Sequence, residues 1–132
     1  AFNFFKYFCP TIVSGGTIIG ITSRTIEVET SYSPSGSYIP AKYALKGLLR
    51  LLSNELKKES TRVYAIAPAF MPGGLNGDIP EKVRQLIVQK SEPEEVAKPE
   101  DVAELVIKLV NDTARVMNGK SITVPDGIAT NL

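Results

Sequence analysis

Tyr38 and Lys42 are the residues whose types and spacing best suit acid-base chemistry. They lie four residues apart at the start of a segment with helical periodicity, so both side chains project from the same helix face. An ammonium group beside a phenol stabilises the phenolate, which makes the tyrosine usable as a proton donor or acceptor. The alternative is an exposed helix pair without a function, because this pair and spacing often occur by chance.

Ser23 is the third candidate for chemistry. It ends a predicted buried strand, where parallel α/β sheets place their ligand sites, and one loop separates it from Tyr38. Its hydroxyl would hold a substrate oxygen beside the phenol, whereas the alternative is an ordinary turn former. The sequence contains no histidine, so acid-base chemistry must use tyrosine, lysine or carboxylates, and no metal site is predicted.

The elements that must position these residues follow from the apolar pattern. Runs rich in β-branched residues predict short strands, buried on both faces, at 17–22, 62–67 and 121–124. Helices are predicted over 1–13, 38–58 and 81–89 and from Pro99 onward, with the first one buried. Residues 24–37 and 91–99 are predicted to be connections. The helix at 38–58 carries one apolar stripe, formed by Ala41, Ala44, Leu45, Leu48, Leu49, Leu52 and Leu56.

The order of these elements predicts an α/β fold. Helices that alternate with strands imply right-handed crossovers, a parallel sheet and a three-layer α/β/α arrangement in a single domain over residues 1–132. A sheet of three strands leaves at least one edge with unpaired backbone groups, so further structure is expected to cover it.

Composition excludes several classes of protein. The 15 basic residues nearly cancel the 14 acidic ones, which predicts no nucleic-acid partner. No apolar run approaches the roughly 20 residues of a membrane span, so no membrane association is predicted. The lone Cys9 cannot form an internal disulfide and is predicted to be a small buried side chain, which is typical of a cytoplasmic protein.

Five ordered blocks of the sequence resemble the short-chain dehydrogenase/reductase family. The blocks are GTIIGITS at 16–23, YIPAKYALKG at 38–47, RVYAIAP at 62–68, KPEDVA at 98–103 and NGKSITVPDG at 118–127. The resemblance implies the C-terminal half of a Rossmann-type fold and an NAD- or NADP-dependent oxidoreductase. Such an enzyme transfers hydride between nicotinamide and a small carbonyl or alcohol substrate, and 3-oxoacyl carrier-protein reductases are the similar subgroup.

The resemblance also implies roles for individual residues. Tyr38 would be the proton donor or acceptor, Ser23 would bind the substrate oxygen, and Lys42 would support the tyrosine and bind the cofactor ribose. Pro68, Phe70 and Met71 would lie beside the nicotinamide ring. The glycine-rich stretch at 72–77 would be a lid on the substrate side, with a plain surface loop as the alternative. The helices at 1–13 and 38–58 resemble the pair that builds a homodimer or tetramer.

The sequence departs from the family in one major respect. The glycine-rich phosphate loop is absent from these residues, and so is the residue that selects NAD or NADP. We therefore expect a partial domain whose N-terminal, dinucleotide-binding half lies outside the chain and covers the open sheet edge. Two hypotheses remain at this point: an oxidoreductase with Ser23, Tyr38 and Lys42 intact, or a non-catalytic interaction or oligomerisation module that keeps part of the fold.

Overall fold

The computed structural model describes residues 2–8, 11–12, 15–28, 36–111 and 117–132. Cys9 and part of the connection predicted at 24–37 lie outside the described residues. The helices and strands are α1 (Phe2–Phe8), β1 (Thr17–Ile21), α2 (Tyr38–Glu55), β2 (Arg62–Pro68), α3 (Glu81–Lys90), α4 (Pro99–Val110), β3 (Lys120–Val124) and β4 (Ala129–Asn131). Short 3₁₀ helices occur at η2 (Arg24–Ile26), η3 (Gly74–Asn76) and η4 (Pro93–Glu95).

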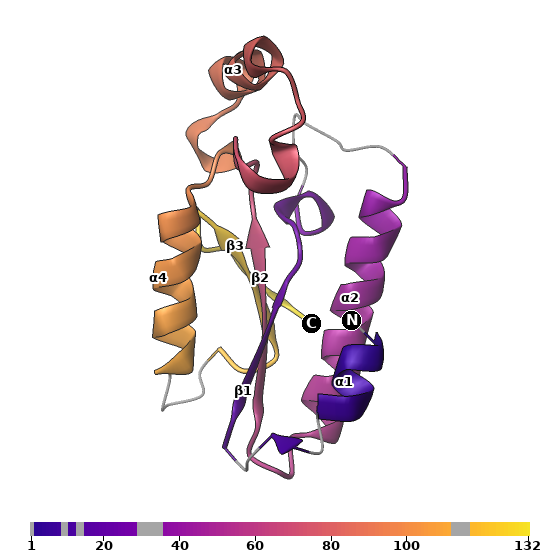
Figure 1. Cartoon of the computed structure of the whole chain (residues 1–132). Helices are drawn as coiled ribbons and strands as arrows, with labels where there is room; N and C mark the ends of the chain where they lie inside the picture. Colours follow the sequence, from indigo (N-terminus) through magenta and orange to yellow (C-terminus); the bar gives the residue numbers. More distant parts are fainter. Residues whose placement is uncertain (1, 9–10, 13–14, 29–35, 112–116) are drawn as a thin grey trace.

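The predicted three-layer α/β fold is confirmed. Strands β1, β2 and β3 are parallel neighbours in that order, and helices cover both faces of the sheet, with α1 and α2 on one side and α4 on the other (Figure 1). Side chains of β2 alternate between the two faces. Val63 and Ala65 pack with Leu49 and Leu52 of α2, whereas Tyr64 and Ile66 lie in the cluster that includes α4.

The prediction of a purely parallel, three-stranded sheet is wrong in one detail. A fourth strand, β4, pairs antiparallel with β3, and Ser121 lies opposite Thr130. Gly127 has a φ of 71°, a conformation that glycine adopts without steric cost, and the chain reverses there. Three residues are too few to show an alternating pattern, so no pattern in the sequence predicts this strand.

The helix α2 begins at Tyr38, as predicted, and ends at Glu55 rather than at Lys58. Leu49 and Leu52 of the predicted stripe are buried against the sheet. Ala41 and Ala44 are exposed, so the buried stripe is narrower than predicted. The helix therefore packs on β1 and β2 by its middle and leaves its first turn beside the ends of the strands.

The prediction of a buried helix over residues 1–13 is wrong for the described part. The helix α1 covers Phe2–Phe8, and its Tyr7 side chain is 69% exposed, while Phe5 is half-buried against the α2 side of the core. Aromatic residues alone do not fix burial, because a short helix can bury only one narrow side. No helix among the described residues is long and apolar enough to cross a membrane.

Candidate active site

A cleft of about 470 Å³ opens at the carboxyl ends of β1 and β2, beside the first turn of α2. This is the edge of a parallel sheet at which α/β proteins bind their ligands. Six residues singled out from the sequence line it together: Ser23, Tyr38, Lys42, Pro68, Phe70 and Met71. The remaining lining comes from the segment after each strand and from the start of α4, and includes Ile21, Thr22, Thr25, Gly73, Asn76, Pro99 and Val102.

Ser23 is held by the extension of β1 beyond its last paired residue. The Thr22 backbone N–H donates to the Ile66 carbonyl at 2.7 Å, and the Thr22 hydroxyl donates to the same oxygen at 3.2 Å. Ser23 itself has only 5% of its surface exposed, and its hydroxyl lies 2.9 Å from the hydroxyl of Thr25, where either group can donate. Because the Ser23 hydroxyl can rotate, it can bond to a substrate oxygen in the cleft without a change of the backbone.

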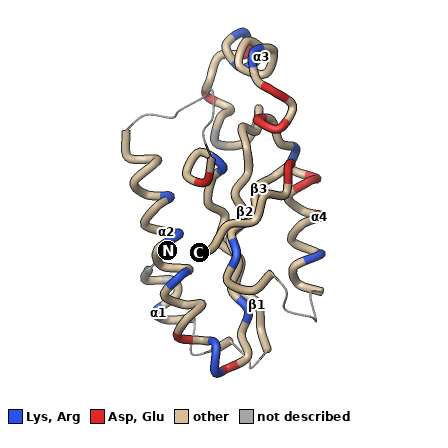
Figure 2. The backbone as a smooth tube through the Cα atoms, turned by 180° about the vertical axis from the view of Figure 1, so that it is seen from behind, with Lys and Arg blue, Asp and Glu red and all other residues tan. Residues whose placement is uncertain are grey.

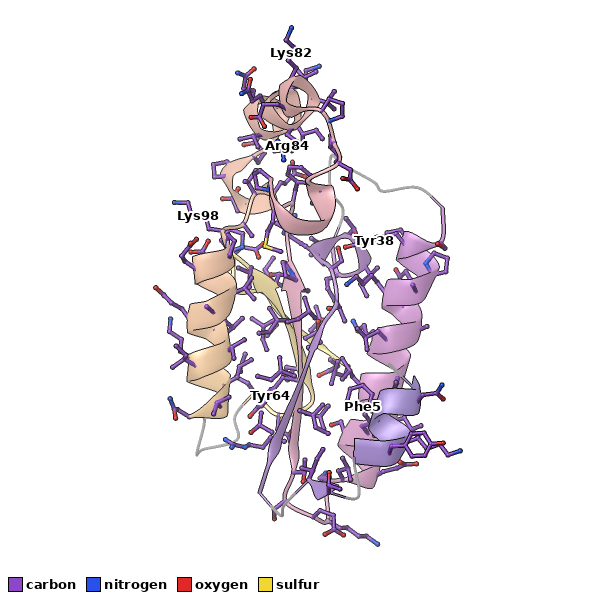
Figure 3. All side chains as sticks on the ribbon, in the orientation of Figure 1. Phe5, Tyr38, Tyr64, Lys82, Arg84 and Lys98 are labelled. Atoms are coloured by element: carbon purple, nitrogen blue, oxygen red, sulfur yellow. The ribbon has the colours of Figure 1, made fainter. Side chains whose placement is uncertain are left out.

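Lys42 lies one turn into α2 and links this helix to β1. Its Nζ donates to the Ile21 carbonyl at 2.9 Å and lies 5.4 Å from the centroid of the Tyr38 ring. Burial lowers the pKa of Lys42 from its usual value, because desolvation disfavours the ammonium form. Figure 3 shows Tyr38 at the end of α2 that lies beside the ends of the strands. The helix therefore presents a phenol and a cation to one cleft, one turn apart.

The opposite wall of the cleft is apolar and is fixed by backbone contacts. Pro68 ends β2, and Phe70 pairs with Val96 through bonds from the Phe70 N–H to the Glu95 carbonyl and from the Ala97 N–H to the Phe70 carbonyl, each 2.9 Å long. The Asn76 side-chain amide donates to the Met71 carbonyl at 2.8 Å. A flat, apolar group can rest on such a wall without displacing bonded polar groups.

The charges around the cleft are unevenly distributed. Lys42 is the one charged side chain on the lining among the described residues. The connection from α3 to α4 and the first turn of α4 carry acidic residues on both sides of Pro99 (Figure 2), namely Glu92, Glu94, Glu95, Glu100 and Asp101. No group of carboxylate, cysteine or histidine side chains in the described part of the chain is arranged to hold a metal ion. The arrangement suits proton transfer beside an apolar ligand.

Several residues that shape the site were missed by the sequence analysis. Gly20 lets α2 approach β1, because a Cβ atom there would lie 2.4 Å from Leu49 Cδ1. Arg24 follows Ser23 directly, and its Nη2 lies 3.0 Å from Asp126 Oδ2, although the two residues are 102 positions apart. Gly20 lies within the predicted strand at 17–22, and a glycine inside a strand often marks a close approach of another element. No pattern in the sequence indicates the pairing of Arg24 with Asp126.

The mostly parallel sheet, the cleft at its carboxyl edge and the helices on both faces define a Rossmann-type α/β protein. A family model described as "Enoyl-(Acyl carrier protein) reductase" matches residues 1–129. The chain belongs to the short-chain dehydrogenase/reductase family.

Curated and solved relatives agree with this assignment. The 3-oxoacyl-[acyl-carrier-protein] reductase FabG of Rickettsia felis is 35% identical over 114 residues, which cover 86% of this chain and 46% of that protein. A short-chain dehydrogenase from Mycobacterium paratuberculosis bound to NAD is 30% identical, with a TM-score of 0.66 over 86% of this chain and 45% of that one. The angucycline C-6 ketoreductase LanV with bound NADP is 27% identical, with a TM-score of 0.76 over 92% and 47%. The chain spans about half the length of the curated relatives it matches.

The cleft fits the nicotinamide end of such a dinucleotide. Pro68, Phe70 and Met71 offer an apolar wall for a flat ring, and Lys42 offers a donor to ribose hydroxyls close to Tyr38. The fit does not extend to the diphosphate, because the sequence contains no glycine-rich phosphate motif and the described lining offers no second cation.

Proposed function

We propose that this protein is an NAD- or NADP-dependent oxidoreductase that interconverts a small carbonyl compound and its alcohol. The observation that carries the proposal is the convergence of Ser23, Tyr38 and Lys42 on one cleft with an apolar wall. Hydride transfer is the chemistry that the nicotinamide supplies when it is bound. The protein contributes orientation, proton transfer and electrostatic stabilisation.

The proposed roles follow from the positions of the three polar groups. In the reducing direction, the Tyr38 hydroxyl donates its proton to the substrate oxygen, and the Ser23 hydroxyl donates a hydrogen bond to the same oxygen. The Lys42 ammonium group stabilises the phenolate that remains, and it also binds the ribose. In the oxidising direction, Tyr38 accepts the proton of the alcohol.

Cofactor contacts are proposed for Tyr38, Lys42, Pro68, Phe70 and Met71. The nicotinamide ring would rest on the wall formed by the last three, and the segment 72–77 would close over the substrate. Residues outside the described cleft would hold the diphosphate and select NAD or NADP. In support, β1 forms one edge of the described sheet, and relatives of about twice this length include proteins with bound NAD or NADP.

The lining favours an uncharged, largely apolar substrate. Ile21, Phe70, Met71 and Val102 would contact its carbon skeleton, and an anionic group near Pro99 would meet Glu100 and Asp101. A short 3-oxoacyl thioester is the first substrate to test, because the reductase from Rickettsia felis is named for that reaction. A cyclic ketone tests the alternative of a compact substrate without a carrier.

A homodimer or tetramer is proposed through the outward face of α2. This face exposes two large apolar side chains, Tyr43 at 55% and Leu51 at 49%, with the small residues Ala44 and Gly47 between them. An apolar stripe of this kind on a surface helix is typical of a protein interface.

The test is the exchange of Tyr38→Phe in the full natural protein that carries these residues, with Tyr43→Phe as the matched control. Turnover of the thioester or ketone with NADH or NADPH should fall by about 10²- to 10⁴-fold in Tyr38→Phe, as for the loss of a general acid or base. Tyr43 lies on the same helix but does not line the cleft, and phenylalanine keeps the apolar ring of the proposed interface, so its variant should keep the parent activity. Equal activity in both variants would exclude Tyr38 from the chemistry, and a parent protein that neither binds nucleotide nor turns over would favour the non-catalytic module.

A further inference from the structure

Glu27 is a buried carboxylate that the proposed reaction does not use. It follows the 3₁₀ helix η2, and only 1% of its side chain is exposed. Three donors converge on it: Lys46 Nζ at 2.6 Å, the Thr130 hydroxyl at 2.6 Å and the Ser121 hydroxyl at 2.8 Å. The donors come from α2, β4 and β3, so one carboxylate joins three elements that are distant in the sequence.

A buried carboxylate is costly unless its charge and its lone pairs are satisfied. Here the Lys46 ammonium supplies the opposite charge, and two hydroxyls occupy further acceptor sites of the carboxylate. Loss of one donor leaves the remaining groups desolvated and less well paired. The folded state is therefore most stable when α2 and β4 stay at fixed distances from Glu27.

Glu27 is coupled to Ser23 through a tight turn. The Ile26 N–H donates to the Ser23 carbonyl at 3.2 Å, and the N–H groups of Glu27 and Val28 donate to the Arg24 carbonyl at 2.9 and 3.1 Å. These bonds make 23–28 one compact unit, so a displacement of the Glu27 carboxylate is transmitted to the backbone that carries the Ser23 hydroxyl.

The other end of the ion pair lies on the helix that carries Tyr38 and Lys42. Lys46 is one turn beyond Lys42, so both lysines point from α2 toward the segment around Ser23. Lys42 bonds to the Ile21 carbonyl, two residues before Ser23, and Lys46 bonds to Glu27, four residues after it. Two tethers from consecutive turns of one helix thus hold the serine-bearing segment on both sides.

We propose that Glu27, through Lys46, is a positioning residue that sets the place of the Ser23 hydroxyl relative to Tyr38. This inference rests on the proposed function for its effect on turnover, but not for its effect on the structure. A change of about 1 Å in the alignment of catalytic groups can lower a rate by about a hundredfold. Loss of the Lys46 tether should therefore lower kcat, while the apolar contacts that bind substrate remain.

The test compares two variants that each remove one donor from Glu27. Lys46→Met removes the tether to α2, and Thr130→Val removes the tether to β4. In the full natural protein, Lys46→Met should lower kcat by about ten- to a hundredfold and change KM and nucleotide affinity by less than about threefold. Thr130→Val should keep kcat within about threefold of the parent value. This should hold even if Thr130→Val lowers the melting temperature as much as Lys46→Met does.

Amide hydrogen exchange gives a second readout that needs no turnover. In Lys46→Met, the bonded amides of Ile26, Glu27 and Val28 should exchange faster, while those of α4 remain as in the parent protein. If the parent protein turns over no substrate but these amides exchange faster in Lys46→Met, the coupling of Glu27 to the Ser23 segment stands. That result would refute the proposed function alone. An unchanged kcat and unchanged exchange in Lys46→Met would overturn the positioning role, and so would an equal loss of kcat in both variants.

Discussion

Replacing Gly20 with alanine should push α2 away from the sheet. Gly20 lies in β1, and a Cβ atom built there would be 2.4 Å from Leu49 Cδ1 and 2.9 Å from Cδ2. Carbon atoms in contact are normally about 3.5–4.0 Å apart, so the new methyl overlaps the leucine by more than about 1 Å. Leu49 is fully buried in a closely packed core, so either its rotamer or the helix must move.

The expected cost can be worked from this overlap. Overfilling a packed core costs about 1–3 kcal/mol, and the lower backbone entropy of alanine in the unfolded chain returns about 0.5–1 kcal/mol, so the middle of the two ranges gives a net loss of about 1 kcal/mol. The site should respond as well, because Gly20 precedes Ile21, whose carbonyl accepts the 2.9 Å bond from Lys42. A retreat of α2 lengthens this bond and lowers kcat.

Urea unfolding of the full natural protein measures the effect. Gly73→Ala is the matched control, because Gly73 is exposed, its φ of −122° suits other residues, and a Cβ atom there meets nothing within 4 Å. Alanine there should leave the free energy of unfolding within about 0.5 kcal/mol of the parent value. Leu49→Ala alone should lower the free energy of unfolding by about 2–5 kcal/mol. In the double variant with Gly20→Ala, the loss should be smaller than the sum of the two single losses by at least about 1 kcal/mol. Full additivity, or a Gly20→Ala protein as stable as the parent, would refute the close approach of helix and strand.

Two further predictions concern charged groups of the site. Lys42→Ala should weaken nucleotide binding and also lower kcat, because Lys42 is proposed to serve in both. Fluorescence titration measures the binding, and steady-state kinetics measure kcat. Unchanged values would make Lys42 a surface lysine without a role in the reaction. Asp126→Asn should destabilise the protein by about 1.5–3 kcal/mol at neutral pH, as for a hydrogen bond to a charged group. Burial alone would raise the pKa of Asp126, but hydrogen bonds from Thr123 and Arg24 and the charge of Arg24 outweigh it and lower the pKa. The stabilisation is therefore present above the usual pKa of about 3.9 and is lost as the pH falls through the lowered value, so unfolding experiments should show the two proteins converging in acid. A constant difference across that range would contradict the role of the carboxylate.

Local pattern was sufficient to predict the elements that carry the chemistry. The start of α2 at Tyr38, and the ends of β1 and β2 to within one residue, could be predicted because long apolar stripes and buried β-branched runs reflect packing over many residues. The strand β4 and the 3₁₀ helix η2 could not, since each has three residues and owes its place to partners far along the chain. Thr130, for example, bonds to Glu27 across 103 positions.

The site could be predicted only in part for the same reason. The spacing of Tyr38 and Lys42 predicts that they share one helix face. The order of the elements predicts that this face lies near Ser23, and all three residues line the same cleft. The charges of Arg24 and Glu27 give no such signal, because charged side chains are ordinarily exposed and only the distant partners Asp126 and Lys46 make their burial stable.

The buried ion pairs explain why the serine and the tyrosine can be placed accurately although they lie on separate elements. A loop alone would leave Ser23 free to shift, because each residue of a flexible segment adds conformational freedom. Arg24 ties the residue next to Ser23 to the turn after β3, Glu27 ties the same unit to α2, and Lys42 ties α2 to β1. Because Arg24 and Glu27 bond to different elements, a shift of their segment away from either element breaks a bond. The placement of the proposed catalytic groups therefore depends in part on Arg24 and Glu27, which do not line the cleft.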